Sequence, residues 1–527
     1  MARKFPFPYF AAALGISLLL PLWSVGENAL AQIKASALPD LNSLPAMKAM
    51  SIFGDPSTQM GFAWNTVNYT DSDLQIVPAQ NGDFASSDVL SFQGKTTVGK
   101  AAGDSFIHKA SAENLTPNTS YAYRYGDKEL NLWSDSGTFT TANPAATSLE
   151  FLHLSDPQGW EESHYTNYAS LLAIATKDSQ PSFIALTGDI VNNDWAGSTP
   201  TLQQWKWAFD TPYATLKNFP VAPVAGNHEA ASYDFSSRFA LDTPRSDSGI
   251  TGNYYSFDYG PAHFTAINTN DTTKTDPATG LGADQLAWVK ADLETSKTKK
   301  WKIVLMHKGL FDAGAHCSNV AGDNDYDIPL IRQQLAPLFT QYGVDLVLQG
   351  HDHLYSRSYP TIAKQDGSAY RYTIDPGYSQ YSQTLDGNPI EMLQNLTGTL
   401  YLTTGTASGS KYYDVVPYDD EIIHIEKTAN TESKVYTDIR IEENKLVAQT
   451  YKVANGTKAF FSGFGIDKSA PIPTPTSSST SASSHGGGSN NGPAIGLILG
   501  SVFGGVTLVG VTILIVVLIK KKKAKEA

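Results

Sequence analysis

Short apolar runs alternate with amphipathic stretches between residues 147 and 468. The apolar runs have the length of buried strands and lie at Glu150–Leu154, Phe183–Leu186, Val221–Ala225, Ile303–Met306 and Leu346–Leu348. Helical spacing predicts helices between them at Tyr165–Thr176, Leu202–Leu216 and Ala283–Leu293. More β structure is expected at Thr399–Thr404 and Val435–Val453. This alternation predicts a layered α/β domain over residues 147–468.

The preceding region, residues 38–142, has a different pattern. Apolar and polar positions alternate, turn signals such as Gly54–Ser57 are frequent, and short strands are expected at Met60–Trp64 and Tyr121–Tyr125. These features predict an all-β sandwich. Leu115–Tyr121 resembles the corner before a late strand of fibronectin type III domains, where a buried Tyr hydroxyl satisfies nearby backbone. Because His, Asp and Cys do not cluster here, we interpret this region as a support or recognition domain.

Both ends of the chain carry targeting patterns. Residues 1–31 combine a basic start, an apolar stretch and an Ala-Leu-Ala cleavage site, which predicts a signal peptide. Residues 494–519 are apolar without a charge, long enough for one transmembrane helix, and the tail 520–527 opens with four lysines. Residues 469–492 are rich in Ser, Thr, Pro and Gly and predict an extended stalk.

These segments predict a single-pass type I membrane protein at the cell surface or in a secretory or lysosomal lumen. The last five residues also resemble an endoplasmic reticulum retrieval signal. Gly496, Gly500 and Gly504 form a small-residue face on which two membrane helices would pack as a homodimer. Acceptor sequons for glycosylation stand at Asn68, Asn114, Asn118, Asn270, Asn395 and Asn455.

Charge and cysteine content limit the possible partners and covalent cross-links of this chain. The formal net charge is −13, and no basic stripe is present to collect phosphate backbones, which argues against nucleic-acid polymers as partners. Cys317 is the only cysteine, so it is either a buried thiol or half of an intermolecular bridge.

Residues of metal-binding type follow every one of the apolar runs. In chain order these are Asp156-Pro157-Gln158, Gly188-Asp189 with Asn192, Gly226-Asn227-His228-Glu229, His307, and Gly350-His351-Asp352-His353. Strand carboxyl ends of an open α/β sheet form one rim where ligands bind, so we expect these side chains in one crevice. His351 and His353 alternate along the chain, so both face one site only if the backbone turns there.

Each motif alone has a plain explanation, since Gly-Asp after a strand is often a turn and a lone His is usually a hydrogen-bonded core or surface residue. Those explanations do not account for five such motifs in order at consecutive strand ends. The series resembles the calcineurin-like metallophosphoesterases. With a β-sandwich before it and GHDHLYSRSYP closing it, the chain is most similar to the purple acid phosphatase branch.

The resemblance implies a four-layer α/β/β/α domain with a dinuclear metal centre that hydrolyses phosphate esters by in-line attack of a bridging hydroxide. Asp156, Asp189 and His353 would hold the first metal, and Asp189, Asn227, His307 and His351 the second. His228 matches the family position that contacts the phosphate and protonates the leaving oxygen; its alternative role is to orient a ligand.

Two positions depart from the family pattern. Purple members carry a Tyr where this chain has Asn192, so we expect a colourless centre. Gln158 stands where broader members have a His ligand and purple ones a Gly; its amide either ligates weakly or hydrogen-bonds a metal-bound water. The identity of the two metal ions is therefore left open among Fe, Zn and Mn.

His316, in the polar loop after His307, is a candidate substrate contact. The leading hypothesis is a membrane-tethered phosphatase acting on small phosphomonoesters or nucleotides. The alternatives are a phosphodiesterase or nucleotide pyrophosphatase built on the same centre, and a catalytically silent surface receptor or adhesin.

Overall fold

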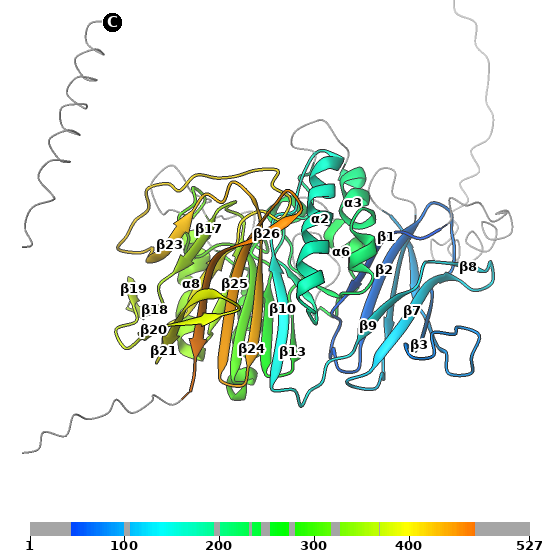
Figure 1. Ribbon diagram of the computed structural model, residues 1–527, viewed down its shortest axis with the longest axis horizontal. Helices are drawn as coiled ribbons and strands as arrows, with labels where there is room; N and C mark the ends of the chain where they lie inside the picture. Colours follow the sequence, from blue (N-terminus) through cyan, green and yellow to red (C-terminus); the bar gives the residue numbers. More distant parts are fainter. Residues whose placement is uncertain are drawn as a thin grey trace, which may run out of the picture. The chain divides into compact units, whose positions relative to one another are not determined.

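The computed structural model describes residues 44–99, 106–193, 201–230, 234–243, 253–272, 280–317, 327–367 and 369–469 (Figure 1). All of them belong to one compact unit that ends at Pro471. The predicted signal peptide 1–31, the membrane helix 494–519, the tail 520–527 and all but the first residue of the stalk 469–492 lie outside the described residues. Within the described part, no helix has the length and hydropathy of a membrane span.

The larger sheet has the strand order β20-β21-β26-β25-β24-β10-β11-β12-β1-β2-β6-β5. Its strands are β1 (Ala46–Ser51), β2 (Met60–Thr66), β5 (Lys95–Val98), β6 (Phe106–Ala112), β10 (Ser148–Leu154), β11 (Ile184–Leu186), β12 (Val221–Pro223), β20 (Ser379–Leu385), β21 (Asn388–Gln394), β24 (Lys434–Glu442), β25 (Lys445–Ala454) and β26 (Thr457–Asp467). In its middle, β10, β11 and β12 run parallel, so their carboxyl ends reach the same edge.

A second sheet has the order β13-β14-β15-β16-β22-β17-β23. Its strands are β13 (Tyr255–Tyr259), β14 (Ala262–Ile267), β15 (Trp301–Lys308), β16 (Leu346–Gly350), β17 (Tyr355–Ser358), β22 (Leu400–Thr403) and β23 (Ile425–Ala429). Strands β14, β15, β16 and β22 are parallel. A hairpin pairs β18 (Thr361–Asp366) with β19 (Ala369–Ile374).

The helices are α2 (Glu162–Asp178), α3 (Thr201–Asp210), α4 (Tyr213–Leu216), α5 (Asn227–Ala230), α6 (Asp234–Arg238), α7 (Ala283–Thr295), the 3-10 helix η4 (Ser296–Thr298) and α8 (Ile328–Tyr342). The helix predicted over Leu202–Leu216 is divided into α3 and α4. Pro212 stands between the two helices, where it lacks the N–H that would continue the first one.

Alternating side chains of the central strands build a four-layer α/β/β/α stack. Phe151 points into a core between the two sheets, together with Phe183 and Phe264. Its neighbour Leu152 points the other way and packs against α2 and α3. On β15, Ile303 likewise joins the core between the sheets, whereas the next residue packs against α7 and α8. The predicted layers are therefore present.

The N-terminal region forms the predicted β-sandwich. Strands β1, β2, β6 and β5 face a smaller sheet across a core rich in aromatic side chains. The smaller sheet consists of β3 (Asp73–Pro78), β4 (Leu90–Gln93), β7 (Ser120–Asp127), β8 (Leu132–Trp133) and β9 (Gly137–Thr140). The hydroxyl of buried Tyr121 accepts a hydrogen bond from the Thr116 N–H at 3.0 Å, as the corner motif predicts.

The sandwich and the α/β region share one sheet. Strand β1 pairs in parallel with β12, with Ser51 opposite Val221, so the larger sheet runs continuously from one region into the other. A β-strand pairing of this kind fixes the two regions more firmly than a linker does.

Two side chains clarify the expectations about modification. Asn270 is buried and its amide donates to the Ala225 carbonyl at 3.0 Å, so the expectation of a glycan there is wrong. Cys317 is fully buried, and burial raises the pKa of its thiol. Of the two roles considered for Cys317, the buried thiol is therefore the one that the structure favours.

Candidate metal centre

The candidate site lies where the carboxyl ends of strands from both sheets meet. Asp156, Asp189 and Asn227 follow β10, β11 and β12 of the larger sheet. His307 is the penultimate residue of β15 and His351 follows β16, both in the second sheet. The expectation of a single-sheet rim is therefore incomplete, because the side chains converge from two stacked sheets.

Unusual backbone conformations aim several of these side chains. Asp156, Asp189 and His351 have φ values of 52°, 49° and 75°, in the left-handed region that non-glycine residues seldom adopt. Such strain is kept where the surrounding structure enforces it. After His351, the Asp352 N–H donates to the Gly350 carbonyl at 2.9 Å, which makes the turn that brings His351 and His353 to one site.

Glycine before Asp189 and before Asn227 permits a close approach of the two ligand loops. Gly188 has a φ of 93°, and a Cβ atom there would lie 2.6 Å from Nδ1 of His307. A Cβ atom on Gly226 would lie 2.1 Å from Oδ1 of Asp189. Larger residues at either position would displace the candidate ligands.

One group of donor atoms comprises Asp156, Asp189 and His353, all buried and all within 4.8 Å of one another. Nε2 of His353 lies 3.4 Å from Oδ1 of Asp156. The Gln158 carboxamide lies beside them, with its Nε2 donating to Asp189 Oδ2 at 3.2 Å and to His353 Nε2 at 3.0 Å. Rotating the amide by a half-turn would bring its oxygen to the same place and give up its contact with Lys411, so Gln158 is positioned as a further metal ligand of this group.

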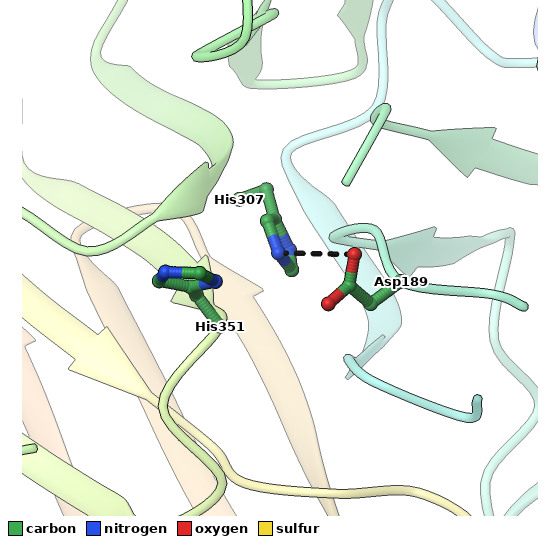
Figure 2. A group of neighbouring side chains, drawn as sticks. All are labelled: Asp189, His307 and His351. Atoms are coloured by element: carbon green, nitrogen blue, oxygen red, sulfur yellow. Dashed lines mark ion pairs between the residues drawn. The ribbon is translucent and has the colours of Figure 1, made fainter. Parts of the chain in front are cut away.

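A second group comprises Asp189, His307 and His351, again within 4.8 Å of one another (Figure 2). Nε2 of His307 lies 3.3 Å from Oδ1 of Asp189 and 2.9 Å from Oδ1 of Asn227. Asp189 thus belongs to both groups, one carboxylate oxygen being available to each.

The histidines are oriented by backbone carbonyls. Nδ1 of His307 donates to the Thr187 carbonyl at 2.7 Å, and Nδ1 of His353 lies 3.3 Å from the Lys411 carbonyl. This arrangement leaves each Nε2 directed at the carboxylates, as is usual for metal-binding histidines.

Glu229 connects the loops that follow β11 and β12. The sequence assigned it no role beyond its motif. Its buried carboxylate accepts the backbone N–H groups of Asp189 at 3.0 Å, Val191 at 3.0 Å and Gly226 at 2.8 Å. Burial, assisted by the charge of Asp189, raises the pKa of Glu229 to about 8.

Charge is balanced within the centre. Burial by itself would raise the pKa of Asp189, but His307 and His228 hold that pKa well below its ordinary value. Burial would lower the pKa of His307, and the Asp189 carboxylate instead raises it to about 9. Each group is thus stabilised by the opposite charge of the other.

His228 lies beside Asp189 and is the more exposed of the two, with 11% of its side chain exposed against 2%. Its Nδ1 donates to the Asn192 carbonyl at 2.8 Å, and its Nε2 lies 3.7 Å from Asp189 Oδ2. The carboxamide oxygen of Asn192 is buried and has no hydrogen-bond partner within the described structure. Asn192 therefore positions His228 through its backbone carbonyl.

His316 also reaches the site, since the centroid of its ring lies 4.4 Å from that of His351. A loop that sequence reasoning missed follows β22: Nζ of Lys411 donates to Gln158 Oε1 at 3.4 Å, and the Tyr413 ring stacks on His353 at 4.6 Å. Because β22 is parallel to β16, the strand-end reasoning applied to the five earlier strands would have found it.

The donor set fits two metal ions. Two groups of converging, buried oxygen and imidazole donors share one carboxylate, which is the ligand type that bridges a pair of cations. Without a cation, two buried aspartates would be held so close at a cost in free energy.

Comparison with known proteins agrees with this geometry. Residues 149–355 match the family Calcineurin-like phosphoesterase, and residues 49–141 match Purple acid Phosphatase, N-terminal domain. A solved purple acid phosphatase from yellow lupin seeds is 16% identical, covers 83% of this chain and 79% of its own, and superposes with a TM-score of 0.61. At that identity the likeness shows the fold.

Curated relatives are more similar in sequence. An uncharacterised protein of Mycobacterium tuberculosis is 26% identical, over 58% of this chain and 60% of the relative. Purple acid phosphatase 23 of Arabidopsis thaliana is 28% identical, over 54% of this chain and 63% of the relative. The match thus spans less than two thirds of these relatives' own length. The chain thus carries a calcineurin-like phosphoesterase domain after a purple acid phosphatase N-terminal domain, and its fold is that of a purple acid phosphatase.

Proposed function

We propose that this chain is a membrane-tethered, metal-dependent phosphatase that hydrolyses small phosphomonoesters, nucleotides among them. The observation that carries the proposal is Asp189, whose carboxylate belongs to both donor groups at the meeting point of the two sheets. When bound there, two cations lower the pKa of a water molecule and neutralise charge on the phosphate.

His228 serves the leaving group in this proposal. Its Nδ1 is engaged by the Asn192 carbonyl, so its Nε2 is the atom that faces the centre. A proton on Nε2 stabilises charge that develops on the departing oxygen, which is general acid catalysis. His316, whose ring lies beside that of His351, is proposed to contact the substrate.

The alternative function, a phosphodiesterase or nucleotide pyrophosphatase, would use the same metal centre. Assays of the full-length protein with p-nitrophenyl phosphate, bis-p-nitrophenyl phosphate and ATP, each with Fe, Zn or Mn, separate these alternatives. We expect turnover of the monoester and of ATP, with loss of activity in His228→Ala. No turnover of any ester with any metal would instead support a silent surface receptor or adhesin.

We further propose that the protein is inserted as a type I membrane protein, with the metal centre on the lumenal or outer face. The charge pattern of residues 494–527 supports this orientation. In sealed microsomes with the cytosolic face outward, added protease should digest a C-terminal tag and leave the metal-binding domain protected, whereas a protected tag would contradict this orientation. Cross-linking of full-length protein before and after replacement of Gly500 by Leu tests the proposed packing of two membrane helices.

A further inference from the structure

A sixth loop, absent from the family motifs, is attached to the metal centre. Residues 404–416 follow β22, and their backbone and hydroxyl groups bind the loop that carries Asp156 and Gln158. The Ala407 N–H donates to the Ser155 carbonyl at 2.9 Å, and the Thr406 hydroxyl donates to the Asp156 carbonyl at 2.9 Å. The Ser408 hydroxyl donates to the Gln158 carbonyl, also at 2.9 Å. The position of this loop is therefore set by the ligand loop itself.

Lys411 occupies the part of this loop nearest the centre. Its carbonyl lies 3.3 Å from Nδ1 of His353, and two residues later the Tyr413 N–H donates to the His353 carbonyl at 3.2 Å. Its side chain is half-buried, and its Nζ donates to Oε1 of Gln158 at 3.4 Å. Because the Gln158 carboxamide also contacts His353, the Lys411 ammonium lies on the side of the first donor group.

We propose that Lys411 binds a phosphate oxygen of the substrate and favours dianionic phosphomonoesters over monoanionic phosphodiesters. This inference rests on the proposed phosphatase function and names the substrate class. A phosphomonoester carries close to two negative charges at neutral pH, whereas a diester carries one. Bound cations repel an ammonium, and an anionic phosphate oxygen is then the partner that Lys411 gains most from contacting.

The geometry suits such a contact. A lysine offers a point charge with three rotatable donors, one of which is engaged by Gln158. Because residues on both sides of Lys411 are hydrogen-bonded to ligand residues, little backbone conformational entropy remains to be lost when a phosphate binds.

The kinetic test uses the metal-loaded full-length protein and the variants Lys411→Ala and Lys411→Arg, with Lys364→Ala as control. Lys364 is an exposed residue of β18 outside the site, and its removal changes the net charge equally. We expect Lys411→Ala to lower kcat/KM for p-nitrophenyl phosphate about 10–100-fold, the range for a lost charged hydrogen bond. The loss for bis-p-nitrophenyl phosphate should be much smaller, and Lys411→Arg should restore most of the monoester activity. Equal losses for both esters, or none, would overturn the proposal.

A binding measurement separates this inference from the proposed function. Titration calorimetry with inorganic phosphate should give a Kd about tenfold or more weaker in Lys411→Ala, with metal content per chain unchanged. If the wild type hydrolyses neither ester, the proposed function fails, and the phosphate Kd still decides the role of Lys411. An unchanged Kd, or loss of metal from the variant, would contradict phosphate binding by this side chain.

Discussion

Oδ1 of Asp189 lies 3.3 Å from Nε2 of His307, although the two residues end strands of different sheets. The pair joins the two inner layers of the fold at one edge, above the core that fills the space between them. Cations held by both residues would connect the layers in the same place. The metal centre is therefore expected to contribute to stability as well as to catalysis.

Metal loading should raise the melting temperature of the wild type and leave the melting temperature of Asp189→Ala nearly unchanged. A ligand that binds only the folded state stabilises it by about 2.7 kcal/mol at a hundredfold excess over Kd. Differential scanning calorimetry of chelator-treated protein with and without Zn measures the difference. Asp258→Ala, which removes a carboxylate outside the centre, is the control and should respond like the wild type. An equal shift in Asp189→Ala would show that the stabilising metal binds elsewhere.

Gln158→His should tighten binding of Zn and Fe at the first donor group. Imidazole is a stronger donor to these metals than a carboxamide, and residue 158 already lies beside Asp189 and His353. Gln158→Leu should weaken the same site, by about 10–100-fold if the amide only orients a ligand. Competition with a chromophoric chelator gives the affinities for Zn and for Fe in the wild type and in each variant. Identical affinities in all three proteins would remove Gln158 from the metal centre.

The iron-loaded protein should have no visible absorption band of the Fe(III)–phenolate type. Asn192 occupies the position that follows the Gly188-Asp189 motif by three residues, and its carboxamide has no phenolate to offer. Visible spectroscopy of protein reconstituted with iron under air is the measurement. A band would mean that a tyrosine from another part of the chain reaches the metal.

Glu229→Ala should destabilise the fold by about 2–4 kcal/mol, because three buried N–H groups lose their acceptor. Glu229→Gln retains one carbonyl oxygen and should cost less. Urea unfolding of both variants measures the loss of free energy. Exposed Glu421→Ala serves as control and should stay within about 0.5 kcal/mol of the wild type.

His263 should make stability depend on pH. Burial would lower its pKa, but hydrogen bonds to Asp258 and Asp292 raise it to about 9, above the value of about 6.5 for an unfolded chain. The stabilisation is therefore complete below about pH 6.5 and is lost as the pH rises through about 9. His263→Gln should cost about 2 kcal/mol at pH 6, a figure reduced for the half-exposed Asp258, and almost nothing at pH 10. An unfolding free-energy difference independent of pH would contradict this.

Much of the centre was predictable because its ligands directly follow strands. Asp156, Asp189 and Asn227 each come after an apolar run too short for anything but a buried strand, so their position at a sheet edge followed from periodicity. Lys411 was missed because its loop carries small polar residues without a recognisable motif. Asn270 was misjudged because a sequon shows the residue type and not its burial.

The sequence by itself determined the succession of the central strands along the chain, the residue types at their ends and the presence of a β-sandwich. These features depend on local periodicity and turn chemistry. Only the tertiary structure decided that the ligands come from two sheets, that Asp189 is shared between two donor groups, and that Gln158 lies between Asp189 and His353. Those relationships join residues up to 195 positions apart in the chain. They arise from the packing of one sheet on another, a long-range contact that no local pattern encodes.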